Sequence, residues 1–229
     1  MNPDDAYIVL GCKSWNRQVF DDLISRWPGR WTYFGSREQL TADSVAALGP
    51  KSLFFLHWSW KVPDAIVAGH ECICFHMTDV PYGRGGSPLQ NLILRGHRET
   101  KLTALRMTQE FDAGPVYLKA ELSLEGSAEE IYRRATLLSA QCIRRIIEER
   151  PKPVPQEGEA TVFARRQPGQ SAIPALAGAE PLYDFIRMLD AEGYPRAFLD
   201  HAGFRFEFDR ARLSADGVSA RVLIKPLPE

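Results

Sequence analysis

The sequence predicts an α/β fold, in which a doubly wound, mostly parallel sheet is followed by a small C-terminal α+β appendage. Three observations lead to this prediction. Short apolar runs typical of buried strands alternate with helical patterns in the first half of the chain. Polar or aromatic loops follow several of these runs, as expected at the ligand-binding edge of a parallel sheet. A proline-rich break at residues 151–155 then separates this alternation from a shorter α and β pattern.

Four apolar runs predict the first strands of the sheet. These runs are residues 6–10, 31–34, 52–57 and 72–76. Apolar residues at helical spacing predict a helix over residues 19–27, for which Asn16 is a suitable N-cap. Residues 41–48 predict a weaker helix that ends at a Gly-Pro pair. The run at residues 52–57 is almost continuously apolar, which is typical of a central parallel strand.

The rest of the chain predicts a second group of elements. They are a short helix over residues 89–95, strands over 101–108 and 116–124, a long helix after a capping box at 127–130, a helix over 181–190, a hairpin over 198–208 and a last strand over 220–225. We therefore expect a main domain at residues 1–155. A linker and a small C-terminal domain on the substrate side are expected at residues 156–229.

Composition restricts the function classes. The chain has 229 residues, 45% of them hydrophobic, a net charge of -1 and a pI of about 6.5. These values predict an ordinary globular protein and favour neither a nucleic-acid partner nor a membrane surface. A cytoplasmic location is expected because the sequence shows neither a secretory leader pattern nor a long apolar run. The four cysteines include no C-x-x-C pair, so reduced thiols are expected. The five histidines have no ligand-like spacing, so no metal site is expected.

A histidine and a carboxylate are the strongest candidates for catalysis. His76 ends the apolar run at 72–76, where a doubly wound sheet places its ligand site. Asp112 lies in an Asp-Ala-Gly-Pro turn, and turn chemistry alone would explain it. A carboxylate beside an imidazole fixes its tautomer and increases its basicity, as general-base catalysis requires. Together, the two residues therefore point to an active site more strongly than either does alone.

Several known motifs are absent from the candidate loops. Residues 81–88 contain three glycines, which suits close approach of a ligand to the backbone. They do not match a phosphate-binding P-loop, and no G-x-G-x-x-G follows the first predicted strand. The sequence also lacks the G-x-S-x-G elbow of a serine hydrolase. These absences argue against those nucleotide-phosphate cradles and against that hydrolase class.

The ordered set of motifs resembles the core of the folate-dependent formyltransferases, which have a Rossmann-like core. The matching stretches are His76 to Pro81, Arg84-Gly85, Pro88 to Gln90, Ile93 and Phe111 to Gly114. The resemblance implies that a substrate amine attacks the formyl carbon of 10-formyltetrahydrofolate. It implies that His76 is the base and electrostatic partner, which Asp112 orients. The implied folate-binding residues are Trp60, Lys61, Val62, Arg84, Gly85, Phe111 and Gly114.

The sequence departs from the family pattern at Cys74, which stands where the family has its catalytic Asn. A thiol is a poor donor to an oxyanion, and losing such a donor costs roughly 3–4 kcal/mol of barrier. We hypothesise that His57, at the end of the neighbouring predicted strand, supplies a substitute. Thr78 replaces the usual Ser and keeps a hydroxyl group.

The overall pattern looks most like the sugar branch, and especially the formyltransferases of bacterial nucleotide-linked amino sugars of the pseudaminic-acid type. The predicted partner is therefore an amino-sugar nucleotide and not a nucleic acid or membrane, with the oligomeric state open and a homodimer included. The predicted substrate contacts are Lys13, Ser14, Trp15, Asn16, Thr78, Tyr194 and Arg196. The alternatives are another amine (methionyl-tRNA, a hydroxyornithine-type precursor or glycinamide ribonucleotide) and a non-catalytic folate- or nucleotide-binding module.

Overall fold

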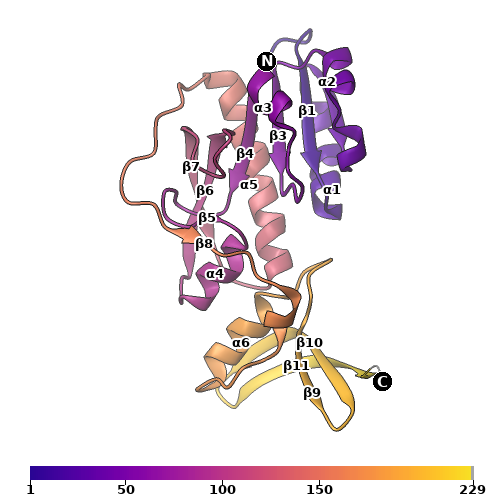
Figure 1. The fold of residues 1–229 in the computed structure, drawn as a ribbon, viewed down its shortest axis with the longest axis vertical. Helices are drawn as coiled ribbons and strands as arrows, with labels where there is room; N and C mark the ends of the chain where they lie inside the picture. Colours follow the sequence, from indigo (N-terminus) through magenta and orange to yellow (C-terminus); the bar gives the residue numbers. More distant parts are fainter. Residues whose placement is uncertain (228–229) are drawn as a thin grey trace. The chain divides into compact units, whose positions relative to one another are not determined.

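The computed structural model describes residues 1–227, which form two compact units (Figure 1). Unit 1 comprises residues 1–85, 100–122 and 133–162, and unit 2 comprises residues 86–99, 123–132 and 163–227. Unit 2 thus takes in two segments that precede residue 156. The division into sequential domains at residue 155 stays a prediction.

Unit 1 is built on a six-stranded sheet with the strand order β2-β1-β3-β4-β6-β7. The strands are β1 (Ala6–Gly11), β2 (Arg30–Phe34), β3 (Ser52–Leu56), β4 (Cys72–His76), β6 (Glu99–Arg106) and β7 (Val116–Ser123). β1 pairs in parallel with both β2 and β3, and β3 pairs in parallel with β4. β6 is antiparallel to β4. The predicted mostly parallel α/β fold is therefore confirmed.

Helices cover both faces of this sheet, because successive strand residues point to opposite sides. The helices of unit 1 are α1 (Ser14–Asp22), η1 (Ile24–Arg26), η2 (Arg37–Gln39), α2 (Ala42–Leu48), α3 (Asp64–Gly69) and most of α5 (Ala128–Glu149). Val9 and Phe54 pack in one apolar cluster with α1 and α5. Leu10 and Phe55 pack in a second cluster with α2 and α3. The short helix α3 was absent from the sequence-based expectation.

The start of α1 differs from the prediction. The helix begins at Ser14 with Lys13 as its N-cap residue, so Asn16 lies inside the first turn and is not the cap. Asn16 is fully buried, donates to the Thr136 hydroxyl at 3.1 Å and accepts the Lys13 backbone N–H at 3.2 Å. A Cβ at Gly11 would lie 2.6 Å from the Asn16 Cβ, so glycine is needed for this close approach.

Unit 2 is a small α+β structure, as predicted for the C-terminal part. It contains α4 (Pro88–Leu94), η3 (Pro168–Ser171), α6 (Ala179–Arg187), β9 (Ala197–His201), β10 (Phe204–Ser214) and β11 (Gly217–Pro226). The last three strands form an antiparallel sheet in the order β11-β10-β9. Buried Arg187 supports α6 by donating to the carbonyls of Leu124 at 2.6 Å and Gly126 at 2.8 Å.

Two further strands are very short. β5 (Arg84–Gly85) and β8 (Val162–Phe163) form a two-stranded sheet. Within residues 1–227, no helix combines the length and the apolar composition needed to cross a bilayer.

Candidate functional site

The site begins at the carboxyl end of β4, where His76 is 8% exposed. Its Nδ1 lies 3.5 Å from Asp112 Oδ1, and its Nε2 lies 2.8 Å from the Gly83 carbonyl oxygen. The structure therefore brings together the histidine and the carboxylate that the sequence singled out. Because they are 36 residues apart in the chain, the β4–β6 pairing and the loop after β6 are needed to create this contact.

The turn that carries Asp112 has a constrained backbone. Asp112 has φ +54°, a left-handed conformation that few non-glycine residues adopt. Its Oδ2 accepts the Gly85 backbone N–H at 2.9 Å. A Cβ at Gly114 would lie 1.8 Å from the Arg106 carbonyl oxygen, so the turn lies directly against the end of β6. These contacts fix both the backbone and the carboxylate of Asp112.

Acceptor groups face both ring nitrogens of His76. The Gly83 carbonyl oxygen lies within hydrogen-bond distance of Nε2, and Asp112 Oδ1 lies 3.5 Å from Nδ1, where it can form an ion pair when the imidazole is protonated. The site therefore places a carboxylate where it can pair with His76.

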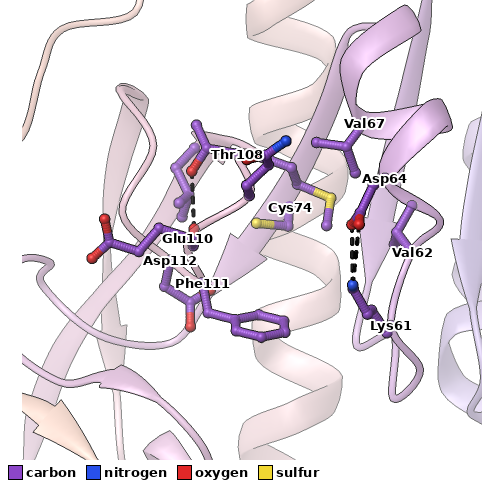
Figure 2. Close-up of a pocket in the computed structure, with 12 residues that line it drawn as sticks. Lys61, Val62, Asp64, Val67, Cys74, Thr108, Glu110, Phe111 and Asp112 are labelled. Carbon is purple, nitrogen blue, oxygen red and sulfur yellow. Dashed lines mark hydrogen bonds and ion pairs between the residues drawn. The ribbon is translucent and has the colours of Figure 1, made fainter.

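A partly open pocket lies next to Asp112 (Figure 2). Val62, Val67, Leu105 and Met107 supply apolar walls, and residues 108–112 form the loop that borders them. In Figure 2, Phe111 and Asp112 lie on the loop side, and Val62 and Val67 lie across the pocket from them. Apolar walls that face a polar loop suit a flat ring that carries hydrogen-bonding atoms, as a pterin does.

The predicted folate residues divide into two groups. Lys61, Val62 and Phe111 line the pocket. Trp60, 37% exposed, packs edge-on against Trp58 and lies outside the lining.

Three other predicted folate residues surround the Asp112 turn without lining the pocket. Arg84 donates to Gln156, Gly85 donates to Asp112, and Gly114 packs against β6. They support Asp112 in this structure, and a direct contact with folate stays a prediction for them.

Cys74 lines the pocket two residues before His76. Burial, reinforced by the negative charge of Asp112, raises the pKa of the Cys74 thiol far above its usual value. The thiol is therefore neutral at physiological pH, and it is a weak donor. The pocket thus contains no amide at the position where the family has one.

His57 lies outside this pocket lining. It follows β3 with φ +49°, and its ring lies 5.9 Å from the ring of buried Trp15. Burial and then repulsion from Lys13 lower the pKa of His57 to about 4, so it is neutral at physiological pH. A role for His57 as substitute donor stays a prediction that this placement does not favour.

The predicted substrate contacts are mostly engaged elsewhere. Trp15, Asn16 and Thr78 are 1%, 0% and 0% exposed, so their side chains belong to the interior of unit 1. Lys13 is half-buried and Ser14 is exposed at the start of α1.

The other two predicted substrate contacts lie in unit 2. Tyr194 stacks on Tyr132 with ring centroids 5.4 Å apart, and Arg196 forms ion pairs with Asp190 and Asp209. Contact with substrate stays a prediction for all of these residues.

The structure adds site residues that the sequence did not single out. Leu105 and Met107 were interpreted as strand residues only, yet they line the pocket. Gln156 lies in the segment predicted to be a linker, yet its side chain bonds to the backbone of Asp112. No motif marked it. Across residues 1–227, no group of three or more His, Cys, Asp and Glu could hold a metal ion.

Comparisons with known proteins agree with this geometry. A family model described as "Methionyl-tRNA formyltransferase, C-terminal domain" matches residues 168–225. A solved structure named methionyl-tRNA formyltransferase from Clostridium thermocellum is 41% identical, with a TM-score of 0.91, and the match covers 97% of this chain and 99% of that chain. HypX from Aquifex aeolicus, in complex with tetrahydrofolic acid, shares the fold at 15% identity, with a TM-score of 0.75 over 96% of this chain and 45% of that chain.

Curated relatives carry the same name. The methionyl-tRNA formyltransferase of Wolinella succinogenes is 27% identical over 157 residues, which is 66% of this chain and 51% of that protein. The chain therefore spans about half the length of the curated relatives it matches.

These relatives correct the predicted acceptor. The assignment to an amino-sugar nucleotide, and with it the exclusion of a nucleic-acid partner, is wrong, because the similar proteins are methionyl-tRNA formyltransferases. The error has a physical cause. The motifs around His76 and Asp112 describe the formyl-transfer centre, which the branches share, and a near-zero net charge does not exclude a local nucleic-acid contact. The class of enzyme is confirmed, and the chain belongs to the folate-dependent formyltransferase family.

Proposed function

We propose that this protein transfers the formyl group of 10-formyltetrahydrofolate to the amino group of methionyl-tRNA. The single observation that carries the proposal is the 41% identity, over nearly the whole of both chains, with a protein of that name. The match of residues 168–225 to a methionyl-tRNA formyltransferase C-terminal domain supports the same acceptor.

The donor fits the pocket beside Asp112. Val62, Val67, Leu105 and Met107 would hold the apolar faces of its ring, and the loop of residues 108–112 would meet its polar edge. When bound, the donor supplies an electrophilic formyl carbon. The acceptor amine forms a bond to this carbon as the carbon–nitrogen bond to the folate breaks.

His76 and Asp112 supply the electrostatics of the reaction. Negative charge develops on the formyl oxygen when the amine attacks, and a fixed positive charge stabilises it. Asp112 and the Gly83 carbonyl hold the His76 imidazole in place, so little reorganisation is needed during the reaction. His76 acts in this step in its protonated form, and the proton that the acceptor amine loses passes to the folate nitrogen that leaves.

A direct assay tests the proposal. The full chain is incubated with 10-formyltetrahydrofolate and methionyl-tRNA, and formylmethionyl-tRNA and tetrahydrofolate are both quantified. We expect equal amounts of the two products, with none when uncharged tRNA and free methionine replace methionyl-tRNA. Binding of folate without formylation of methionyl-tRNA would overturn the proposal and favour a non-catalytic binding module.

A further inference from the structure

The segment at residues 151–159 is ordered against the site, although its composition is that of a linker. Val154 and Val116 exchange two backbone hydrogen bonds, at 2.7 and 2.8 Å, which attach the segment to β7. Pro153 and Pro155 flank Val154, and proline restricts the backbone to extended conformations there. This attachment fixes the position of Gln156, two residues further along the chain.

The Gln156 side chain uses both ends of its amide. Its Nε2 donates to the backbone carbonyls of Asp112 and Gly114, each at 2.8 Å. Its Oε1 accepts from Arg84, at 3.0 Å from Nε and 2.8 Å from Nη2. An amide has two N–H groups and two acceptor positions on its oxygen, so this arrangement uses its full capacity.

These contacts form a closed ring around the catalytic carboxylate. Arg84 holds Gln156, and Gln156 holds the backbone of Asp112. The Asp112 carboxylate accepts the N–H of Gly85, which is the residue after Arg84. Asp112 is thus held through its backbone and its side chain by the same Arg-Gly dipeptide. Its left-handed backbone, at φ +54°, needs such support.

We propose that Gln156 is a positioning residue that sets the contact between Asp112 and His76 in the proposed formyl transfer, on which this inference rests. Its side chain is bonded to the Asp112 backbone, so it acts through Asp112 and not on the reacting atoms. Glutamate has nearly the same shape as glutamine but places a carboxylate against two carbonyl oxygens. Only an amide satisfies both the carbonyls and Arg84.

The kinetic test compares two variants with a matched control. Gln156→Met keeps the length and removes all four hydrogen bonds, and Gln156→Glu keeps the Arg84 contact but opposes the carbonyls. Gln141→Met, on the exposed face of α5, is the control. We expect kcat to fall about 10- to 100-fold in both Gln156 variants, with an unchanged KM for methionyl-tRNA, because misplacement of a catalytic group has effects of this size. The control should match the wild type.

A spectroscopic test separates positioning from activity. The ¹⁵N signal of His76 Nδ1, assigned by its loss in His76→Gln, reports the contact with Asp112 without any substrate. Asp112→Asn defines the signal of the lost contact. In Gln156→Met the signal should move from the wild-type position toward that reference, and in Gln141→Met it should not move. The measurement uses no substrate, so its outcome does not depend on which amine is the acceptor. Failure of this inference can therefore be distinguished from failure of the methionyl-tRNA assay.

The inference is overturned if the Gln156→Met protein is folded and its His76 Nδ1 signal stays at the wild-type position. Thermal unfolding establishes that the variant is folded. If Gln156→Met does not fold, the same measurement on Gln156→Glu decides, because glutamate keeps the bond to Arg84. An unmoved signal in that variant has the same meaning.

Discussion

Two histidines lie at the carboxyl ends of neighbouring parallel strands, yet their surroundings differ. His76 is the last residue of β4 and faces the Gly83 carbonyl and the Asp112 carboxylate. His57 follows β3 and meets the Trp15 ring and the positive field of Lys13, which with burial lower its pKa to about 4. The topology puts a histidine at two adjacent strand ends. Of the two histidines, only His76 faces a carboxylate in these contacts, so position in the sheet identifies candidates and the contacts select among them.

The largest expected effect comes from removing His76, the histidine that lies beside a carboxylate. His76→Ala should lower kcat/KM for methionyl-tRNA by at least about 10³-fold, since general acid–base and electrostatic contributions are of this order. His57→Gln should stay within a few-fold of the wild type, because His57 does not line the pocket. Steady-state kinetics with folded protein provide the measurement. Equal losses in the two variants would end the distinction and support His57 as the substitute donor.

Removing the carboxylate should have the next largest effect. Asp112→Asn keeps the size of the side chain but loses the charge that accompanies an imidazolium at His76. We expect kcat to fall about 10²- to 10³-fold. This is less than the roughly 10⁴-fold loss when the aspartate of a serine-protease triad becomes asparagine, because the Gly83 carbonyl still holds Nε2. Single-turnover formylation measures the chemical step directly. A wild-type rate would remove Asp112 from the mechanism.

A smaller gain is expected when the missing amide is restored. Cys74→Asn introduces a donor into the pocket wall two residues before His76. An oxyanion donor contributes roughly 3–4 kcal/mol where its geometry is optimal. The neighbours of residue 74 are not arranged to orient an amide, so the new donor should increase kcat by only about 10-fold. Cys74→Ser serves as the control for the change of thiol alone. A fall in kcat for Cys74→Asn would show that the pocket is adapted to the thiol.

The sequence predicted those parts of the site that follow from local pattern and from position in the sheet. Apolar runs located the strands, and the carboxyl-end rule placed His76 at the ligand edge. The turn residues around Asp112 were visible, although its left-handed backbone was not. Gln156 was missed because its role depends on the pairing of Val154 with Val116, a contact between a proline-rich segment and a strand 38 residues earlier. Such long-range contacts leave no periodic signal.

The local structure after β1 differs from the expected loop for a related reason. Lys13 to Asn16 follow a strand, and a polar loop was expected there. Gly11 instead allows Asn16 to pack against the end of β1, so α1 begins at once and Trp15 and Asn16 are buried. The acceptor could not be predicted from the catalytic motifs, since these describe the transfer centre alone.

The smallest expected effect concerns the pH dependence of stability, and it tests the buried surroundings of His57. His57 has a folded-state pKa lowered from 6.5 to about 4, so below pH 6.5 the unfolded chain binds a proton there more readily than the folded chain. The stability that the neutral imidazole contributes is therefore complete above pH 6.5 and is lost as the pH falls toward 4, by about 2–3 kcal/mol. His57→Asn removes this titration, so urea unfolding between pH 7 and pH 4 should show a shallower loss of stability than in the wild type.

His201→Asn, at an exposed strand end, should reproduce the wild-type slope. If the free energy of unfolding depends on pH in the same way in His57→Asn and in the wild type, His57 takes up its proton as readily in the folded protein as in the unfolded chain. The contrast with His76 would then rest on their hydrogen-bond partners alone.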